Sequence, residues 1–391
     1  MKTVFNWPAG LAVLSLSLAG CIDFAADDGG SSETDGACED GCPTGRHGLS
    51  GELMLFANGR ATSAEGQYQT NIPLAQGGTY LGSAIYLYDP DAVCDDGGTA
   101  CRMVELGKLA LDESMGELSV GDGSLKKFVI RDIAWSPTQG LWAVTYDVLN
   151  DEWAIAEITV PDWHATGQRL GIERYTILPG DPQAAGTDPC YWQENVSGLA
   201  FFGDELLLGV RGLGGTGIRN DGLVFRVDLD VIREQGWCEY ENDISRDPHY
   251  YACDVLCEPW ADFGPALGVA GDLEVAPDRT QLLALARAED EHIMPLDRQA
   301  IYTVAPPAGE PTTPLATGLY VEGIAPGLDI EGLARVDGVL FGIDVAATLW
   351  RFDEGEGAVS VLEDLASHFE EPELSVRIRG ATTVTVPPGD G

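Results

Sequence analysis

The chain has 391 residues, 45% of them hydrophobic, and its 63 acidic and 22 basic side chains give a formal net charge of −41. This charge repels phosphate backbones and anionic lipid headgroups, so it excludes nucleic acid as a partner. Two interpretations of the charge stay open, which are solubility outside the cell and affinity for divalent cations or cationic partners.

The first 20 residues are predicted to be a targeting segment. Lys2 gives it a positive start, and the apolar run that follows to Leu18 is too short to span a membrane. The run ends in Leu18-Ala19-Gly20-Cys21, which resembles the lipobox of bacterial lipoproteins. The resemblance implies cleavage before Cys21, lipid on this residue and, because Ile22 replaces an Asp retention signal, the outer membrane of the cell envelope as the destination. An ordinary secretory signal followed by a structural Cys is the alternative.

Acidic side chains lie among Gly, Ser and Thr in the next segment. Residues 22–48 contain too little apolar surface to offset the entropy lost on ordering. We therefore expect residues 21–48 to be a lipidated Cys and a solvated tether, which holds a folded domain of residues 49–391 off the membrane.

Short strands follow throughout the rest of the chain. Three are predicted over 53–56, 84–89 and 103–109, and after them a three-strand unit recurs four times. The units open at Asp132, Gly198, Asp272 and Gly332. Strand-only units at such a period predict a β-propeller.

The opening strand occurs a fifth time, alone, over 379–386. The N-terminal strands lack an opening strand, so joining the two ends of the chain completes one blade and closes the ring. Closure removes exposed strand edges, which are prone to aggregation. The sequence therefore predicts an all-β propeller of five blades, or six if 51–120 or 230–270 contains another.

An aromatic, cysteine-containing insertion is predicted at 236–262, within the third blade. It is interpreted either as a lid over blade edges or as a surface that binds a partner or ligand.

Eight cysteines remain besides Cys21, and an even number in an exported chain indicates disulfides. Sequence neighbours suggest four pairs, which are Cys38–Cys42, Cys94–Cys101, Cys190–Cys238 and Cys253–Cys257. A zinc site at Cys238, Cys253 and Cys257 is the alternative, although paired CxxC halves are missing.

The segment Asp329-Ile330-Glu331-Gly332-Leu333-Ala334 resembles the DxEGLA blade start of the phytase/esterase-like and gluconolactonase-like propeller groups. In the second group a Glu at this place helps to hold a divalent metal in the central channel, so the resemblance implies Glu331 as a metal ligand. The four equivalent positions are not acidic; they are Arg131, Ser197, Gly271 and Arg379. A polar channel closed by salt bridges is therefore the other interpretation.

Oxygen ligands near these positions suit calcium, which takes six to eight of them. The predicted calcium ligands are Glu331, Asp272, Asp132, Asn195 and Asp344. No catalytic base is assigned.

Recognisable catalytic motifs do not occur in the sequence. It has no nucleophile elbow and no HExxH pair, and its five histidines are scattered. We therefore expect a monomeric, non-catalytic module that is anchored by lipid and binds a protein, glycan or small molecule. The alternative is a calcium-dependent hydrolase of phosphoesters or lactones, in which the metal polarises the scissile group or activates water. The hydrolase needs a solvent-open acidic pocket on the axis, and the module does not.

Overall fold

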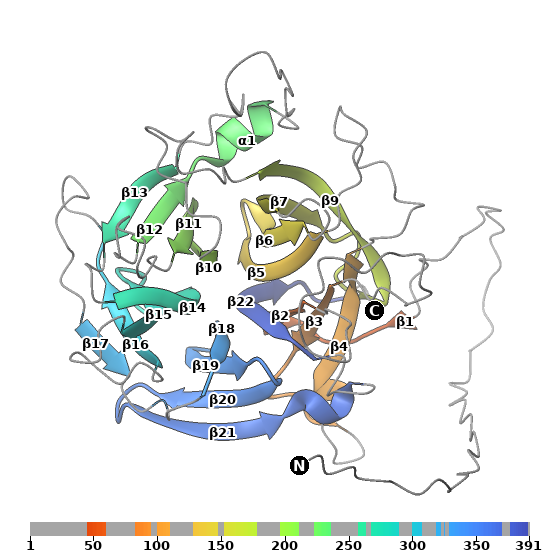
Figure 1. The fold of residues 1–391 in the computed structure, drawn as a ribbon. Helices are drawn as coiled ribbons and strands as arrows, with labels where there is room; N and C mark the ends of the chain where they lie inside the picture. Colours follow the sequence, from red (N-terminus) through yellow and green to blue (C-terminus); the bar gives the residue numbers. More distant parts are fainter. Residues whose placement is uncertain are drawn as a thin grey trace, which may run out of the picture. The chain divides into compact units, whose positions relative to one another are not determined.

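The computed structural model describes residues 45–59, 83–94, 100–109, 128–147, 152–177, 196–210, 223–235, 257–262, 267–288, 299–306, 318–321, 324, 328–369 and 376–389. The predicted targeting segment and nearly all of the tether lie outside these residues. Strands make up most of the described chain (Figure 1).

Three blades are separate four-stranded sheets, each paired in sequence order. Blade three contains β10 (Val196–Phe202), β11 (Glu205–Val210), β12 (Leu223–Val227) and β13 (Cys257–Asp262). Blade four contains β14 (Leu267–Val275), β15 (Leu282–Ala288), β16 (Gln299–Val304) and β17 (Gly318–Val321). Blade five contains β18 (Ile330–Val336), β19 (Val339–Asp344), β20 (Thr348–Asp353) and β21 (Ala358–Asp364).

Blades one and two share one eight-stranded sheet. Blade one contains β22 (Ile378–Val386), β2 (Gly51–Asn58), β3 (Ala84–Tyr88) and β4 (Met103–Leu109). Blade two contains β5 (Phe128–Ser136), β6 (Gly140–Asp147), β7 (Glu152–Thr159) and β9 (Gln168–Ile177). The two blades join where β4 pairs in parallel with β9, from Gly107↔Gln168 to Leu109↔Leu170. The other pairs in this sheet are antiparallel.

The two ends of the domain close the ring. C-terminal β22 pairs antiparallel with N-terminal β2 from Gly51↔Val386 to Asn58↔Ile378. The innermost strands β5, β10, β14, β18 and β22 contact one another in that order and back to β5 (Figure 1). The domain is therefore a five-bladed β-propeller, and the predicted closure is confirmed.

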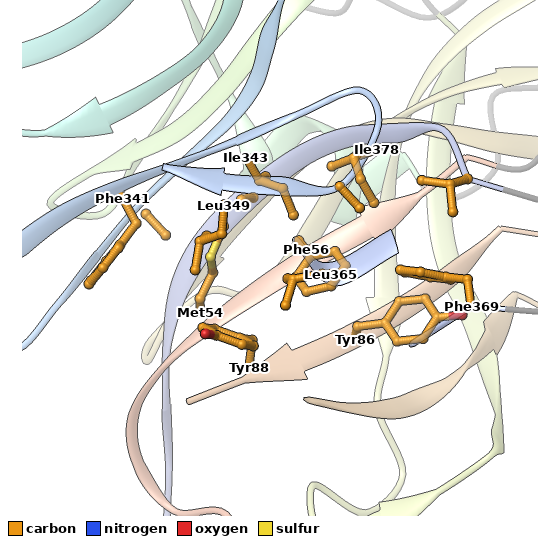
Figure 2. Close-up of a cluster of buried hydrophobic side chains, with 14 of the residues drawn as sticks. Met54, Phe56, Tyr86, Tyr88, Phe341, Ile343, Leu349, Leu365, Phe369 and Ile378 are labelled. Carbon is orange, nitrogen blue, oxygen red and sulfur yellow. The ribbon is translucent and has the colours of Figure 1, made fainter. Parts of the chain in front are cut away.

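The apolar residues of the strands fill the spaces between blades. One cluster of buried side chains lies at each of the five junctions. Figure 2 shows the junction between blades five and one, where Ile343 and Leu349 pack with Phe56 and Tyr86. Because the blades are covered on both faces, the second strands are nearly all apolar, as β11 (ELLLGV) illustrates.

The structure also contains short elements outside the five blades. β1 (Gly45–Arg46) pairs with β8 (Ala165–Thr166), and α1 (Leu229–Gln235) follows β12 directly. Two 3₁₀ turns occupy Ala100–Arg102 and Leu365–His368. Within the described residues, no helix has the length and apolar character needed to cross a membrane.

Two predicted boundaries need correction. The opening strands begin before the predicted starts; β5, for example, begins at Phe128 and passes through a register shift between Ile130 and Asp132. The predicted insertion 236–262 also ends too late, because β13 forms the outer strand of blade three. Residues 236–256 lie outside the described residues.

One predicted disulfide is confirmed. Cys94 and Cys101 are bonded, with their Cα atoms 5.6 Å apart. Cys38, Cys42, Cys190, Cys238 and Cys253 lie outside the described residues, and the side chain of Cys257 is not described. Their pairing stays a prediction.

Candidate functional site

The five inner strands bring the same repeat position to the centre of the ring. At this position blades two and four carry Asp132 and Asp272, whereas the other three blades carry Gly198, Gly332 and Gly380. Both aspartates are fully buried, at 1% and 0% exposure. Among the predicted calcium ligands that the structure describes, Asp132 and Asp272 are hydrogen bonded to each other.

Asp272 is held by backbone groups from three blades. The N–H of Leu273 donates to its Oδ1 at 2.6 Å, while the N–H groups of Leu333 and Ala381 donate to its Oδ2 at 2.8 and 3.2 Å. Such charge-assisted bonds favour an ionised carboxylate. Asp272 therefore ties together the inner strands of blades four, five and one.

Asp132 receives the corresponding groups of the remaining two blades. The N–H of Ile133 donates to its Oδ1 at 2.7 Å, and the N–H of Leu199 also hydrogen bonds to this carboxyl group. Each of the five blades thus contributes one N–H to the aspartate pair.

The two carboxyl groups are placed to share one proton. Oδ2 of Asp132 is buried and accepts no hydrogen bond from the described residues, yet the side chains of Asp132 and Asp272 are hydrogen bonded to each other. Two ionised carboxylates cannot form such a bond, whereas an acid and a carboxylate can. Burial raises the pKa of both groups well above the usual range, and the charge of Asp272 raises the pKa of Asp132 further. Because Asp272 accepts three backbone N–H groups and Oδ2 of Asp132 accepts none from the described residues, we assign the proton to Asp132 and the negative charge to Asp272.

Glycine at the other three positions leaves room for this pair. A Cβ atom on Gly380 would overlap the Asp132 carboxyl group and lie 2.8 Å from the Asp132 Cα. A Cβ on Gly332 would lie 2.7 Å from the Ala381 nitrogen, the atom that donates to Asp272. The repeat therefore alternates two carboxyl groups with three positions that have no side chain.

The preceding residues of the inner strands in blades two, five and one, which are Arg131, Glu331 and Arg379, form a second polar layer. Glu331 forms an ion pair with Arg379 at 3.3 Å, with both side chains less than one-fifth exposed. Burial raises the pKa of Glu331, while the charges of Arg379 and Arg131 act in the opposite direction. The guanidinium of Arg131 lies over the Trp153 ring, 5.4 Å from its centre. The ion-paired channel considered from the sequence agrees with this arrangement.

Another predicted ligand, Asp344, has contacts with the turn and the strand that follow it in the sequence. Asp344, at the end of β19, accepts hydrogen bonds from the N–H groups of Ala346 and Thr348 and from Nε1 of Trp350. Asn195 lies outside the described residues. Among the residues that the structure describes, no three His, Cys, Asp or Glu side chains are grouped as metal ligands. The calcium site stays a prediction.

From the contacts of these carboxylates, we expect calcium to leave the thermal stability of the protein unchanged. Backbone N–H groups and Arg379 place positive charge where a cation would bind, so we expect equal melting temperatures for the full chain in EDTA and in excess Ca²⁺. Thermal melts of the wild type, of Glu331→Gln and of the exposed control Glu173→Gln test this. A calcium-dependent rise lost only in Glu331→Gln would instead support the calcium site.

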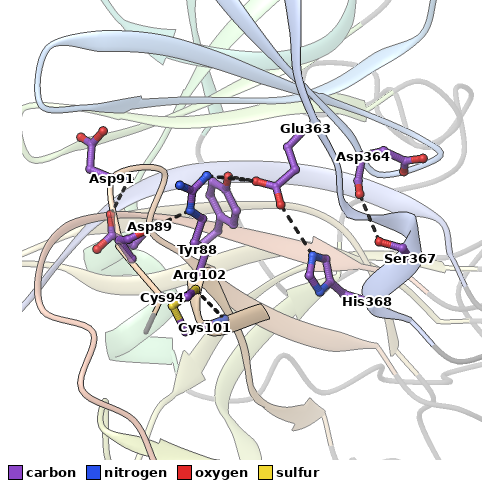
Figure 3. Close-up of polar contacts among 11 residues, drawn as sticks. Tyr88, Asp89, Asp91, Cys94, Cys101, Arg102, Glu363, Asp364, Ser367 and His368 are labelled. Carbon is purple, nitrogen blue, oxygen red and sulfur yellow. Dashed lines mark hydrogen bonds and ion pairs between the residues drawn. A yellow bond between two sulfur atoms is a disulfide. The ribbon is translucent and has the colours of Figure 1, made fainter. Parts of the chain in front are cut away.

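A polar network at the outer edge joins blades five and one, and sequence patterns did not predict it. Glu363 of β21 accepts a hydrogen bond from the Tyr88 hydroxyl at 2.6 Å and lies 3.6 Å from Arg102 and 3.7 Å from His368 (Figure 3). Burial and the Glu363 charge raise the pKa of Tyr88, so the phenol stays protonated rather than becoming a nucleophile. The Cys94–Cys101 disulfide closes the loop that precedes Arg102 (Figure 3).

Comparison with known proteins yields structural similarity alone. No family model matches the sequence, and no curated protein matches it significantly. The β-propeller domain of Myceliophteria thermophila Cps50 (Swd1) is 12% identical over 72% of this chain and 80% of that chain, with a TM-score of 0.28. A Lactobacillus plantarum protein is 13% identical over 86% and 100%, with a TM-score of 0.33. A puromycin hydrolase mutant is 14% identical over 81% of this chain but 39% of its own, with a TM-score of 0.29. Similarity this low carries no argument about function.

Proposed function

We propose that the chain is a lipid-anchored β-propeller of the cell envelope that binds a protein, glycan or small-molecule ligand without catalysing a reaction. The observation that carries this proposal is the burial and internal pairing of the described carboxylates at the axis. Asp132 and Asp272 are fully buried and engaged by five backbone N–H groups, and Glu331 is paired with Arg379. A solvent-open acidic pocket, which the hydrolase alternative needs, is not what these contacts favour.

The charge of the chain supports attachment by lipid rather than by surface adhesion. A protein with net charge −41 is repelled by anionic headgroups, so a covalent anchor has to supply the attraction. Lipid on Cys21 would do so, since each buried CH₂ adds about 0.8 kcal/mol. The tether would then keep the propeller in water, where its loops are accessible to ligands.

The anchor is tested by replacing the lipid-accepting residue. We expect the full-length protein to partition with outer membranes and into the detergent phase, and Cys21→Ser to lose both properties because it has no thiol to modify. Cys94→Ser serves as the matched control and should remain in the membrane fraction. Equal partitioning of wild type and Cys21→Ser would contradict the anchor. Hydrolysis of phosphoesters or lactones by the purified wild type at ordinary enzymatic rates would contradict the non-catalytic role.

A further inference from the structure

A cavity of about 420 Å³ lies beside the short β1–β8 sheet, away from the buried axial aspartates. Its lining residues come from the start of the described chain, from the loop before β8 and from the C-terminal end; they are Arg46, His47, Gly48, Ser50, His164, Pro388 and Gly389. Among these described residues there is no Asp or Glu. The chain has a net charge of −41, so a cavity whose ionisable lining groups are one guanidinium and two imidazoles is unusual in this protein.

The two imidazole rings present buried nitrogens that have no hydrogen-bond partner among the described residues. These atoms are Nε2 of His47 and Nε2 of His164, and the ring centres lie 5.7 Å apart. His164 is 8% exposed. A buried polar atom without a partner costs about 1–3 kcal/mol, so native proteins rarely keep one without a reason such as an absent ligand.

The backbone selects the kind of ligand that His47 can bind. The N–H of Leu49 donates to Nδ1 of His47 at 3.2 Å, so the neutral ring carries its proton on Nε2. Nε2 is then a hydrogen-bond donor, which suits an anionic oxygen and opposes a metal cation.

The surrounding charges agree with this assignment. Burial is the largest cause that lowers the pKa of His47, and electrostatic interactions with His164 and Arg46 lower it further. The Trp163 carbonyl and the Asp162 carboxylate act in the opposite direction. Arg46 forms an exposed ion pair with Asp162 at 2.9 Å, which neutralises part of the guanidinium charge. An oxyanion in the cavity would accept a hydrogen bond from the neutral His47 ring and be attracted by the Arg46 guanidinium.

We propose that this cavity binds the phosphate or carboxylate group of a small molecule, with His47 and His164 as hydrogen-bond donors and Arg46 as the nearby cation. The inference deepens the proposed function, on which it rests, because it names the chemical class of a ligand.

Thermal melts of the full-length protein in inorganic phosphate, in acetate and in chloride at equal ionic strength test the inference. At about a hundredfold excess over Kd, the ligand that binds should raise the melting temperature by roughly 3–4 °C, and chloride should not. Phosphate acting alone, or acetate acting alone, identifies the preferred group. His164→Gln should abolish the rise, whereas the control His368→Gln, at the distant Glu363 network, should retain it.

A second measurement guards against variants that fold poorly. In imidazole NMR spectra of the wild type, addition of the binding anion should shift the Nε2 resonances of His47 and His164 and leave His368 unchanged. No thermal rise, or a rise that persists in His164→Gln, would overturn the inference. Either result leaves the Cys21→Ser fractionation unaffected, so failure of the cavity and failure of the anchor are distinguishable.

Discussion

Asp272→Asn should destabilise the propeller by about 3 kcal/mol or more, measured as the free energy of unfolding in urea. The native carboxylate accepts N–H groups from Leu273, Leu333 and Ala381. An Asn at this position has one acceptor oxygen, and its NH₂ group would point at a backbone donor or at the Asp132 acid. Each buried donor left without an acceptor costs about 1–3 kcal/mol.

Asp132→Asn is the matched control, since it makes the same chemical change a few ångströms away. Here the side-chain NH₂ replaces the acid O–H as donor to Asp272, and the amide oxygen still accepts from Ile133 and Leu199. We expect a loss of about 1 kcal/mol or less. If both variants lost the same stability, the assignment of acid and carboxylate would be wrong.

The shared proton also predicts the direction of a pH effect. The pKa of the pair is raised by burial, so the folded state retains a proton that the unfolded chain releases above pH of about 4. Stability should therefore fall as pH rises from about 4 toward the folded pKa, by about 1.4 kcal/mol per pH unit, and Asp132→Asn should remove this slope. Glu274, whose pKa burial raises to about 7, contributes with the same sign. The comparison is therefore made in a Glu274→Gln background.

Gly380→Ala should also destabilise the domain by about 3 kcal/mol or more. The new Cβ would overlap the Asp132 carboxyl group and lie 2.8 Å from the Asp132 Cα, so β22 and β5 would have to separate at the centre of the ring. Overpacking alone costs about 1–3 kcal/mol, and displacement of Ala381 would weaken a hydrogen bond to Asp272 as well.

Gly171→Ala provides the comparison for Gly380→Ala in urea melts. Gly171 also lies in a strand, β9, but its Cβ would be 4.0 Å from the nearest atom, the Thr159 Cβ. This variant should change stability by no more than about 0.5 kcal/mol. Wild-type stability in Gly380→Ala would show that the axis tolerates side chains and would contradict the tight packing described above.

The fold was predictable because units of similar strands recur along the sequence. Four units and a lone fifth opening strand indicated five blades, and the unmatched strands at the two ends indicated that 379–386 completes blade one. The lengths of the strands were harder to predict from the sequence. For example, β5 begins at Phe128 and passes through an irregularity at Asp132 instead of starting there. A bulge of this kind leaves no periodic signal.

The site was predictable in part. Asp132 and Asp272 share a repeat position with three glycines, and that pattern already indicates crowding, although the sequence alone suggested calcium ligands. The proton between them depends on burial and on N–H groups from five separate blades, which a single sequence does not reveal. The cavity at His47 and His164 was missed because its residues are more than one hundred positions apart and follow no motif.

Closure by β22 gives the propeller a definite order of assembly. β2 is made early, but its inner edge has no partner until β22 has been synthesised. The parallel contact of β4 with β9 can cover the opposite edge of blade one much sooner. A nascent chain therefore presents one unpaired strand edge for most of its synthesis, and this edge distinguishes an unfinished propeller from a complete one.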